Sequence, residues 1–146
     1  MSPSLVTTDQ INQWIEQIPY AKMIGVQAVE TESGLIFELA VKKTNIGNPV
    51  LPALHGGVVA AFMETAAILN VMALTDGQKI PKIINFSLDY LRSVELKPTY
   101  ARCELGRMGK RVVNVAVHVW QDQQDEKPLA LGRAHLIWPQ ENHNEA

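Results

Sequence analysis

The chain opens with apolar residues at helical spacing and continues with apolar residues that alternate with polar ones. The helical spacing predicts an amphipathic helix over Thr8–Ile18, which Thr8 or Asp9 caps and Pro19 ends. Alternating segments lie on either side of a Glu-Ser-Gly turn, and this pattern predicts a β-hairpin. Its strands are expected over Gly25–Thr31 and Leu35–Val41.

A long apolar segment follows, after an aperiodic loop over Lys42–Leu54. It begins at His55-Gly56-Gly57 and runs to about Thr75 as a predicted helix, which would span about 30 Å. Apolar residues lie on nearly all sides of this helix, so it must be buried on most sides. Glu64, Thr65 and Asn70 interrupt it, so we expect no membrane span.

The rest of the chain contains β-like segments separated by turn residues. They are Ile83–Arg92, Thr99–Arg107, Arg111–Gln121 and Leu129–Trp138. The predicted order is therefore α-β-β-α-β-β-β-β, which is typical of the α+β class with antiparallel strands. A curved sheet wrapped around the long helix would bury it, as would a partner protomer packed beside the sheet. We expect one domain over residues 1–146, with flexible ends at 1–7 and 139–146.

Composition narrows the possible functions. The net charge of −2 argues against a general nucleic-acid-binding protein. Charged residues make up 19%, which leaves apolar surface for a partner chain. Cys103 is the only cysteine, so the chain has no intrachain disulfide, and no His or Cys spacing indicates a metal site. The polar start lacks a signal-peptide pattern, so we expect a cytoplasmic protein.

Glu64 is the unusual residue of the long helix. A carboxylate among apolar residues is costly unless it is paired or faces solvent. It either points into a solvent gap or pairs with an arginine, or it acts as a general base or nucleophile.

The Gly56-Gly57 pair at the helix start is the second candidate. It leaves backbone N–H groups accessible, and the helix dipole favours negative charge there. This could form an oxyanion hole for a carbonyl under attack, or it could only solve a packing problem. The neighbouring His55 is a capping or hydrogen-bonding residue more often than a catalyst.

The spacing of Gly56 and Glu64 limits how they could act together. Eight residues separate them, which is ~12 Å along a helix and roughly 80° around it. Donor and base must both lie within ~3 Å of the reacting group. If both residues are catalytic, Gly56 of one chain must face Glu64 of another, as in a homodimer with antiparallel helices.

The turn around Gly109 concentrates positive charge. Arg107, Lys110 and Arg111 lie there with few acidic neighbours. This turn is either a solvated hairpin tip or a contact for the phosphates of an anionic ligand.

Several segments together resemble hotdog-fold acyl-CoA thioesterases of the phenylacetate-pathway (PaaI-like) branch. The resemblance begins at His55-Gly56-Gly57-Val58 and Glu64-Thr65-Ala66. It continues through Phe86–Arg92, Arg107–Arg111 and Leu129–Ala134, and covers most of the chain from about Gly25 to Trp138. It implies a sheet wrapped around the central helix, and dimers, often paired into tetramers, with active sites at the interface.

The resemblance also implies roles for individual residues. The Gly56 N–H would polarise the thioester carbonyl, and Glu64 of the other protomer would activate water or attack directly. His55 would hold the loop and assist orientation. The turn residues Arg107, Lys110 and Arg111 would contact the phosphates of coenzyme A, which enters as part of the substrate. No other cofactor and no metal is implied.

Substrate contacts are expected from the loop and the helix. Relatives often carry Asn or Gln where this chain has Pro49, and Gly where it has Pro52; Asn48 could substitute for the missing amide. The expected substrate-binding residues are Asn48, Leu51, Leu54, Gly57, Phe62, Met63 and Ile68, a mostly apolar set that fits an acyl chain or aryl ring.

The altered loop keeps a second hypothesis open, a hotdog protein that binds acyl-CoA or a related ligand without hydrolysing it. A dehydratase acting on acyl carrier protein is disfavoured, because the spacing of Gly56 and Glu64 fits the thioesterase pattern better.

Overall fold

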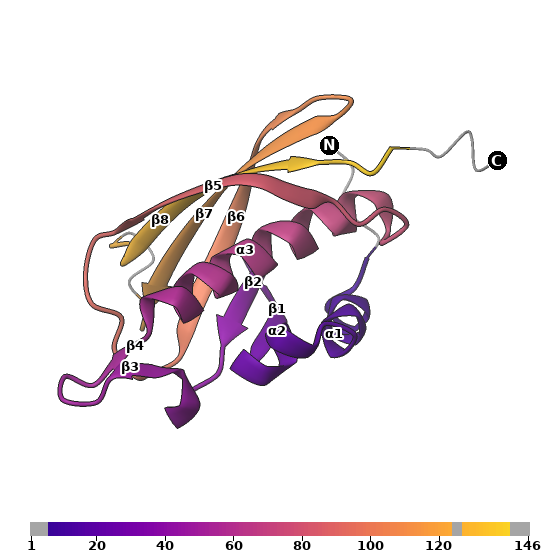
Figure 1. Ribbon diagram of the computed structural model, residues 1–146. Helices are drawn as coiled ribbons and strands as arrows, with labels where there is room; N and C mark the ends of the chain where they lie inside the picture. Colours follow the sequence, from indigo (N-terminus) through magenta and orange to yellow (C-terminus); the bar gives the residue numbers. More distant parts are fainter. Residues whose placement is uncertain (1–5, 124–126, 141–146) are drawn as a thin grey trace.

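A six-stranded antiparallel sheet curves around one long helix, α3 (Gly56–Met72), in the computed structural model (Figure 1). The structure describes residues 6–123 and 127–140. The strand order is β1-β2-β6-β7-β8-β5. The strands are β1 (Val26–Thr31), β2 (Gly34–Leu39), β6 (Thr99–Met108), β7 (Val112–Gln121), β8 (Ala130–Ile137) and β5 (Lys82–Tyr90). The predicted α+β hotdog architecture is confirmed.

Alternation of apolar and polar residues explains why these segments form strands with one buried face. In β7, Val113, Val115, Val117 and Val119 point into the core, and the residues between them are only partly buried. Such one-sided burial fixes the register, because a slip by one residue would turn the valines to solvent. The predicted β1–β2 hairpin pairs Val26 with Leu39.

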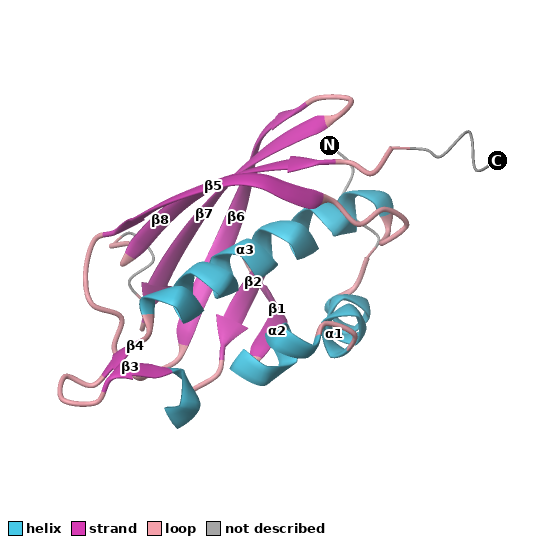
Figure 2. Cartoon of the chain, viewed as in Figure 1, coloured by secondary structure: helices cyan, strands magenta, loops and turns pink. Residues whose placement is uncertain are grey.

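Helix α3 lies on the concave face of the sheet, as Figure 2 shows. Its buried side chains are Val58, Val59, Phe62, Met63, Ala66, Ala67, Leu69, Val71 and Met72. A short 3₁₀ turn, η2 (Ala73–Thr75), extends it to the predicted end. By length and composition alone, Gly56–Thr75 would also suit a membrane span despite its polar residues. In the structure this helix packs against the sheet as part of the hydrophobic core.

The N-terminal region differs in detail from the prediction. Helix α1 (Thr8–Glu16) is capped by Thr7, whose side chain accepts the Gln10 N–H, rather than by Thr8 or Asp9. Pro19 does not only end a helix; it begins a second one, α2 (Pro19–Ile24), because proline is tolerated at a first helical position. Gly25 ends α2 with φ of 92°, a conformation that favours glycine.

The outer edge of β1 is covered by α1. The Asn12 side chain donates to the Ala28 carbonyl at 3.1 Å and accepts the Ala28 N–H at 2.8 Å. Because these groups face away from β2, Asn12 occupies positions that another strand would otherwise use. At the opposite edge, β5 pairs with β8 alone within the described part of the chain.

The predicted loop over Lys42–Leu54 contains regular structure. A 3₁₀ turn, η1 (Lys43–Asn45), precedes a small hairpin of β3 (Ile46–Asn48) and β4 (Ala53–Leu54). This short pairing satisfies the hydrogen-bonding groups of a backbone segment that lies outside the six-stranded sheet. The expected flexibility of residues 1–7 and 139–146 falls mostly on residues outside the described ranges.

Candidate active site

The hydrogen bonds at the start of α3 leave one donor accessible. His55 is the N-cap: its Nδ1 accepts the Gly57 N–H at 2.9 Å. Its carbonyl accepts the N–H groups of Val58 and Val59 at 3.0 and 3.2 Å. An imidazole that accepts at Nδ1 carries its proton at Nε2. Among the described residues, the Gly56 N–H has no acceptor, so it is the donor of the first turn left for a ligand.

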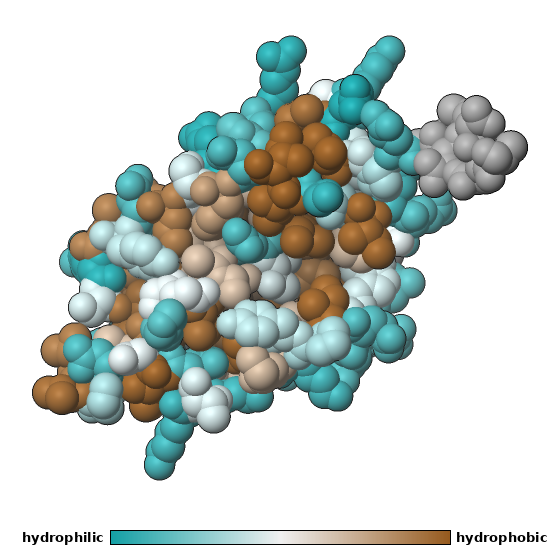
Figure 3. Space-filling view, viewed as in Figure 1, coloured by the Kyte–Doolittle hydropathy of each residue, from teal (hydrophilic) through white to brown (hydrophobic). Residues whose placement is uncertain are grey.

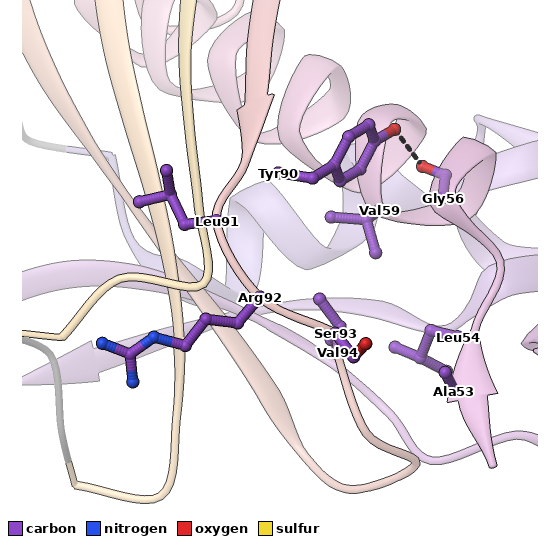
Figure 4. A pocket seen from close by; sticks show the side chains of 9 residues that line it. All are labelled: Ala53, Leu54, Gly56, Val59, Tyr90, Leu91, Arg92, Ser93 and Val94. Carbon is purple, nitrogen blue, oxygen red and sulfur yellow. Dashed lines mark hydrogen bonds between the residues drawn. The ribbon is translucent and has the colours of Figure 1, made fainter. Parts of the chain in front are cut away.

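A pocket of about 380 Å³ lies beside this helix start (Figure 4). Its residues come from β4, the first turn of α3, the end of β5 and the segment that follows it. They are Ala53, Leu54, Gly56, Val59, Tyr90, Leu91, Arg92, Ser93 and Val94. The lining combines apolar side chains with polar groups, as small-molecule sites do. The pocket brings together two residues predicted from sequence, Leu54 and Gly56.

Glu64 lies two turns further along α3 and is half-buried. Its carboxylate forms no hydrogen bond or ion pair with any described residue. The alternative in which Glu64 pairs with an arginine of its own chain is therefore not seen in the described ranges. Gly56 and Glu64 lie about 12 Å apart along the helix axis, so one chain does not bring them to the same atom.

The other predicted substrate residues occupy three different environments. Phe62 and Met63 are fully buried in the core and do not line the pocket, whereas Ile68 is half-buried. Leu51 is 63% exposed at the tip of the β3–β4 hairpin. Asn48 stabilises that tip, because its Oδ1 accepts the N–H groups of residues 50 and 51.

The predicted CoA-binding turn lies at the other end of the sheet. Arg107, Lys110 and Arg111 are exposed at the β6–β7 hairpin, whose end pairs with the last residue of β8, Ile137. Ile137 also pairs with the start of β5, whereas Gly56 contacts the end of β5. Within one chain, the turn and the helix start are therefore separated by most of the sheet length.

Sequence reasoning missed the last residue of β5 and those that follow it. Tyr90 donates from its hydroxyl to the Gly56 carbonyl at 2.7 Å, and Arg92 and Ser93 line the pocket. The resemblance covered this segment without assigning it a role. The sequence feature that could have indicated them is the run of three large residues, Tyr90 to Arg92, where the strand alternation ends. All three are exposed in the structure.

Cys103 is unsuited to nucleophilic chemistry. Burial raises the pKa of its thiol well above the usual range, so very little thiolate is present at neutral pH. Among the described residues, no group of His, Cys, Asp and Glu is arranged to hold a metal ion.

Comparison with known proteins agrees with this architecture. The family model of the thioesterase superfamily matches residues 51–127, which include the helix start, Glu64 and the basic turn. No curated protein matches the chain. A solved structure of a Chromobacterium violaceum protein is 36% identical, covers 88% of this chain and 93% of its own, and has a TM-score of 0.71.

More distant structures share the fold. A thioesterase from Haemophilus influenzae is 18% identical over 95% of this chain and 96% of its own, with a TM-score of 0.81. A Ralstonia eutropha protein described as related to phenylacetic acid degradation is 20% identical over 87% and 98%, with a TM-score of 0.72. The resemblance predicted from sequence is confirmed: the chain belongs to the thioesterase superfamily.

Proposed function

We propose that the protein is an acyl-CoA thioesterase of the cytoplasm, which converts a thioester and water to a carboxylic acid and free CoA. Membership of the thioesterase superfamily supports thioester hydrolysis as the reaction. The observation that carries the proposal is the Gly56 N–H, a donor without an acceptor among the described residues, at the edge of a pocket. A second observation, the carboxylate of Glu64 without an ion-pair partner in the described ranges, supplies a base.

The chemistry follows from these two groups. The thioester carbonyl oxygen accepts the Gly56 N–H, which stabilises the negative charge that develops as the tetrahedral intermediate forms. Glu64 of the second protomer takes a proton from water, and the water oxygen bonds to the carbonyl carbon. The C–S bond then breaks, and the proton passes to the leaving sulfur. Direct attack by the carboxylate, followed by hydrolysis of the anhydride, gives the same products.

The proposed active unit is a homodimer, alone or in a dimer of dimers. The edge of β1 is occupied by Asn12, whereas β5 offers an edge with exposed Ile84. Figure 3 shows hydrophobic side chains gathered over the C-terminal part of α3 and the adjoining start of β5. Exposed apolar residues of this region include Leu74 and Ile80. Antiparallel pairing through β5 would place the two α3 helices side by side in opposite directions.

Such a dimer would also bring the basic turn of one chain close to the pocket of the other. A two-fold axis through β5 brings the start of one β5 to the end of the other. The turn with Arg107, Lys110 and Arg111 lies at the β5 start of its own chain, so it would come to the Gly56 end of the partner. This arrangement supports its proposed contact with CoA phosphates.

The test measures thiol release from short, medium, long and aryl acyl-CoAs by wild-type protein and by Glu64→Gln. Wild type should hydrolyse at least one class, and the variant should lose at least ~10² in kcat. The exposed Glu32→Gln is the control for charge removal and should match wild type. If the folded wild-type protein releases no thiol but binds acyl-CoA saturably, the non-catalytic binding protein replaces this proposal.

A further inference from the structure

One peptide group at the start of α3 is held from both sides. Its carbonyl, that of Gly56, accepts the Tyr90 hydroxyl at 2.7 Å (Figure 4). Its N–H, that of Gly57, donates to His55 Nδ1 at 2.9 Å. Tyr90 ends β5, whereas His55 precedes the helix. The sheet and the N-cap therefore hold the same Gly56–Gly57 peptide.

A helix start made of two glycines needs such support. Glycine has no Cβ and samples more backbone conformations than other residues, so its N–H directions are poorly fixed by local sterics. The Gly56 N–H belongs to the His55–Gly56 peptide, whose carbonyl accepts the N–H groups of Val58 and Val59. The backbone angles of Gly56 connect this peptide to the Gly56–Gly57 peptide, so movement of the second peptide also shifts the direction of the Gly56 N–H. Catalytic donors must keep their position closely, since a displacement of ~1 Å can cost about 10²-fold in rate.

The position of Tyr90 is not explained by burial. The residue is 53% exposed, so the hydrophobic effect contributes little to its place. Its ring nevertheless lies against Gly56: a Cβ at that position would be 3.3 Å from Tyr90 Oη and 3.4 Å from Cζ. The hydrogen bond to Gly56 is the interaction that accounts for this placement.

We propose that Tyr90 is a positioning residue that aims the Gly56 N–H at the thioester carbonyl oxygen by holding the Gly56–Gly57 peptide. The proposal rests on the proposed function. Tyr90 acts through Gly56 and takes no part in bond making. Losing its hydroxyl should therefore weaken stabilisation of the transition state and leave ground-state binding of the substrate unchanged.

The first measurement is the steady-state kinetics of Tyr90→Phe, which removes the hydroxyl and keeps the ring. We expect kcat to fall ~5- to 20-fold with KM within about 2-fold of wild type, a smaller loss than removal of an oxyanion donor. Tyr20→Phe is the matched control, since Tyr20 is 47% exposed on α2 and does not line the pocket.

The second measurement follows hydrogen exchange at the N–H of the Gly56–Gly57 peptide. Protein labelled with ¹⁵N-glycine gives signals from nine residues, and amide exchange with water can be followed at Gly57. We expect exchange at Gly57 to accelerate at least ~5-fold in Tyr90→Phe, because the peptide opens more often when its carbonyl loses the bond from the Tyr90 hydroxyl. Tyr20→Phe should show wild-type exchange.

The two measurements separate the possible failures. Faster exchange together with the lower kcat supports the proposal. Unchanged exchange at Gly57, or faster exchange with an unchanged kcat, overturns it. A folded wild-type protein that hydrolyses no acyl-CoA removes the proposed function and the catalytic role of Tyr90 with it, and the exchange data then report only whether the hydroxyl holds the peptide.

Discussion

Asn45 and His55 are joined through their main chains: the His55 N–H donates to the Asn45 carbonyl at 2.8 Å. The buried side chain of Asn45 donates in turn to the Ile24 carbonyl at 2.9 Å. These bonds connect the end of α2 to the residue that caps α3. Asn45 therefore supports the helix start without lining the pocket.

Asn45→Ala should destabilise the fold by about 1–3 kcal/mol, because the Ile24 carbonyl loses its partner in a buried position. Urea unfolding measures the change in the free energy of unfolding, provided that the dependence on urea concentration has the same slope in both proteins. The exposed Gln13→Ala should stay within ~0.5 kcal/mol of wild type. Equal midpoints for Asn45→Ala and wild type would show that the buried amide is not needed for stability.

Gly56→Pro tests the proposed oxyanion donor directly, because proline lacks the N–H. Proline suits the first position of a helix, and His55, with φ −64° and ψ 130°, already has the conformation favoured before proline. We expect kcat to fall ~10²- to 10³-fold.

Gly56→Ala is the matched control for Gly56→Pro. It keeps the N–H and adds a Cβ 3.3 Å from the flexible end of Tyr90, so its loss should stay below ~10-fold. Equal losses in the two variants would assign the effect to steric contact with Tyr90 rather than to the missing donor.

Mixed oligomers test whether the site is shared between chains. A dimer of one Glu64→Gln chain and one Gly56→Pro chain would keep one intact site, made by Gly56 of the first chain and Glu64 of the second. Random pairing of equal amounts should restore about a quarter of wild-type activity per chain. Mixtures as inactive as the two parents would place both residues of a site in the same chain.

Reversing charge at the basic turn should affect only substrates that carry the CoA phosphates. Lys110→Glu combined with Arg111→Glu should raise KM for an acyl-CoA at least ~10-fold, with kcat changed less than about 3-fold. KM for the matching acyl-pantetheine, which lacks the nucleotide, should not change. An unchanged KM for acyl-CoA would remove this turn from the binding site.

Cys103 should react slowly with a thiol dye in the native protein at pH 8, because burial raises its pKa and keeps the thiol protonated. In urea the single cysteine should react promptly. As pH rises through the unfolded-state pKa, the unfolded chain loses this proton and the native chain keeps it, so this group lowers stability there. Rapid labelling of native protein would contradict the burial of the thiol.

The sequence patterns that predicted best are those in which burial follows a strict period. The valines of β7 alternate, and the apolar helix runs from Gly56 to the 3₁₀ turn at its end. The predicted caps of α1, Thr8 and Asp9, lie one and two residues after the actual cap, Thr7, which forms a reciprocal pair with Gln10. Pro19 predicts the end of a helix, but it also suits a first helical position and begins α2.

The candidate site was predictable only where its residues are adjacent in sequence. The Gly56 donor follows from the glycine pair and the first-turn rule for helices. Tyr90 lies 34 residues away and meets Gly56 only after β5 has joined the sheet. The sequence around Asn45 does not indicate that its side chain is buried, because its hydrogen-bond partner, the Ile24 carbonyl, lies 21 residues away. Such tertiary contacts have no period for a sequence pattern to reveal.

The contact between Asn12 and Ala28 also limits how many subunits can share one sheet. A subunit with two bare edges would add neighbours on both sides and grow into a fibre. Here Asn12 of the subunit's own helix bonds the β1 edge at Ala28, and within the described residues β5 is the opposite edge of the six-stranded sheet. If chains pair through β5 as proposed, strand addition to this sheet would stop at two chains, and a dimer of dimers would form through other surfaces.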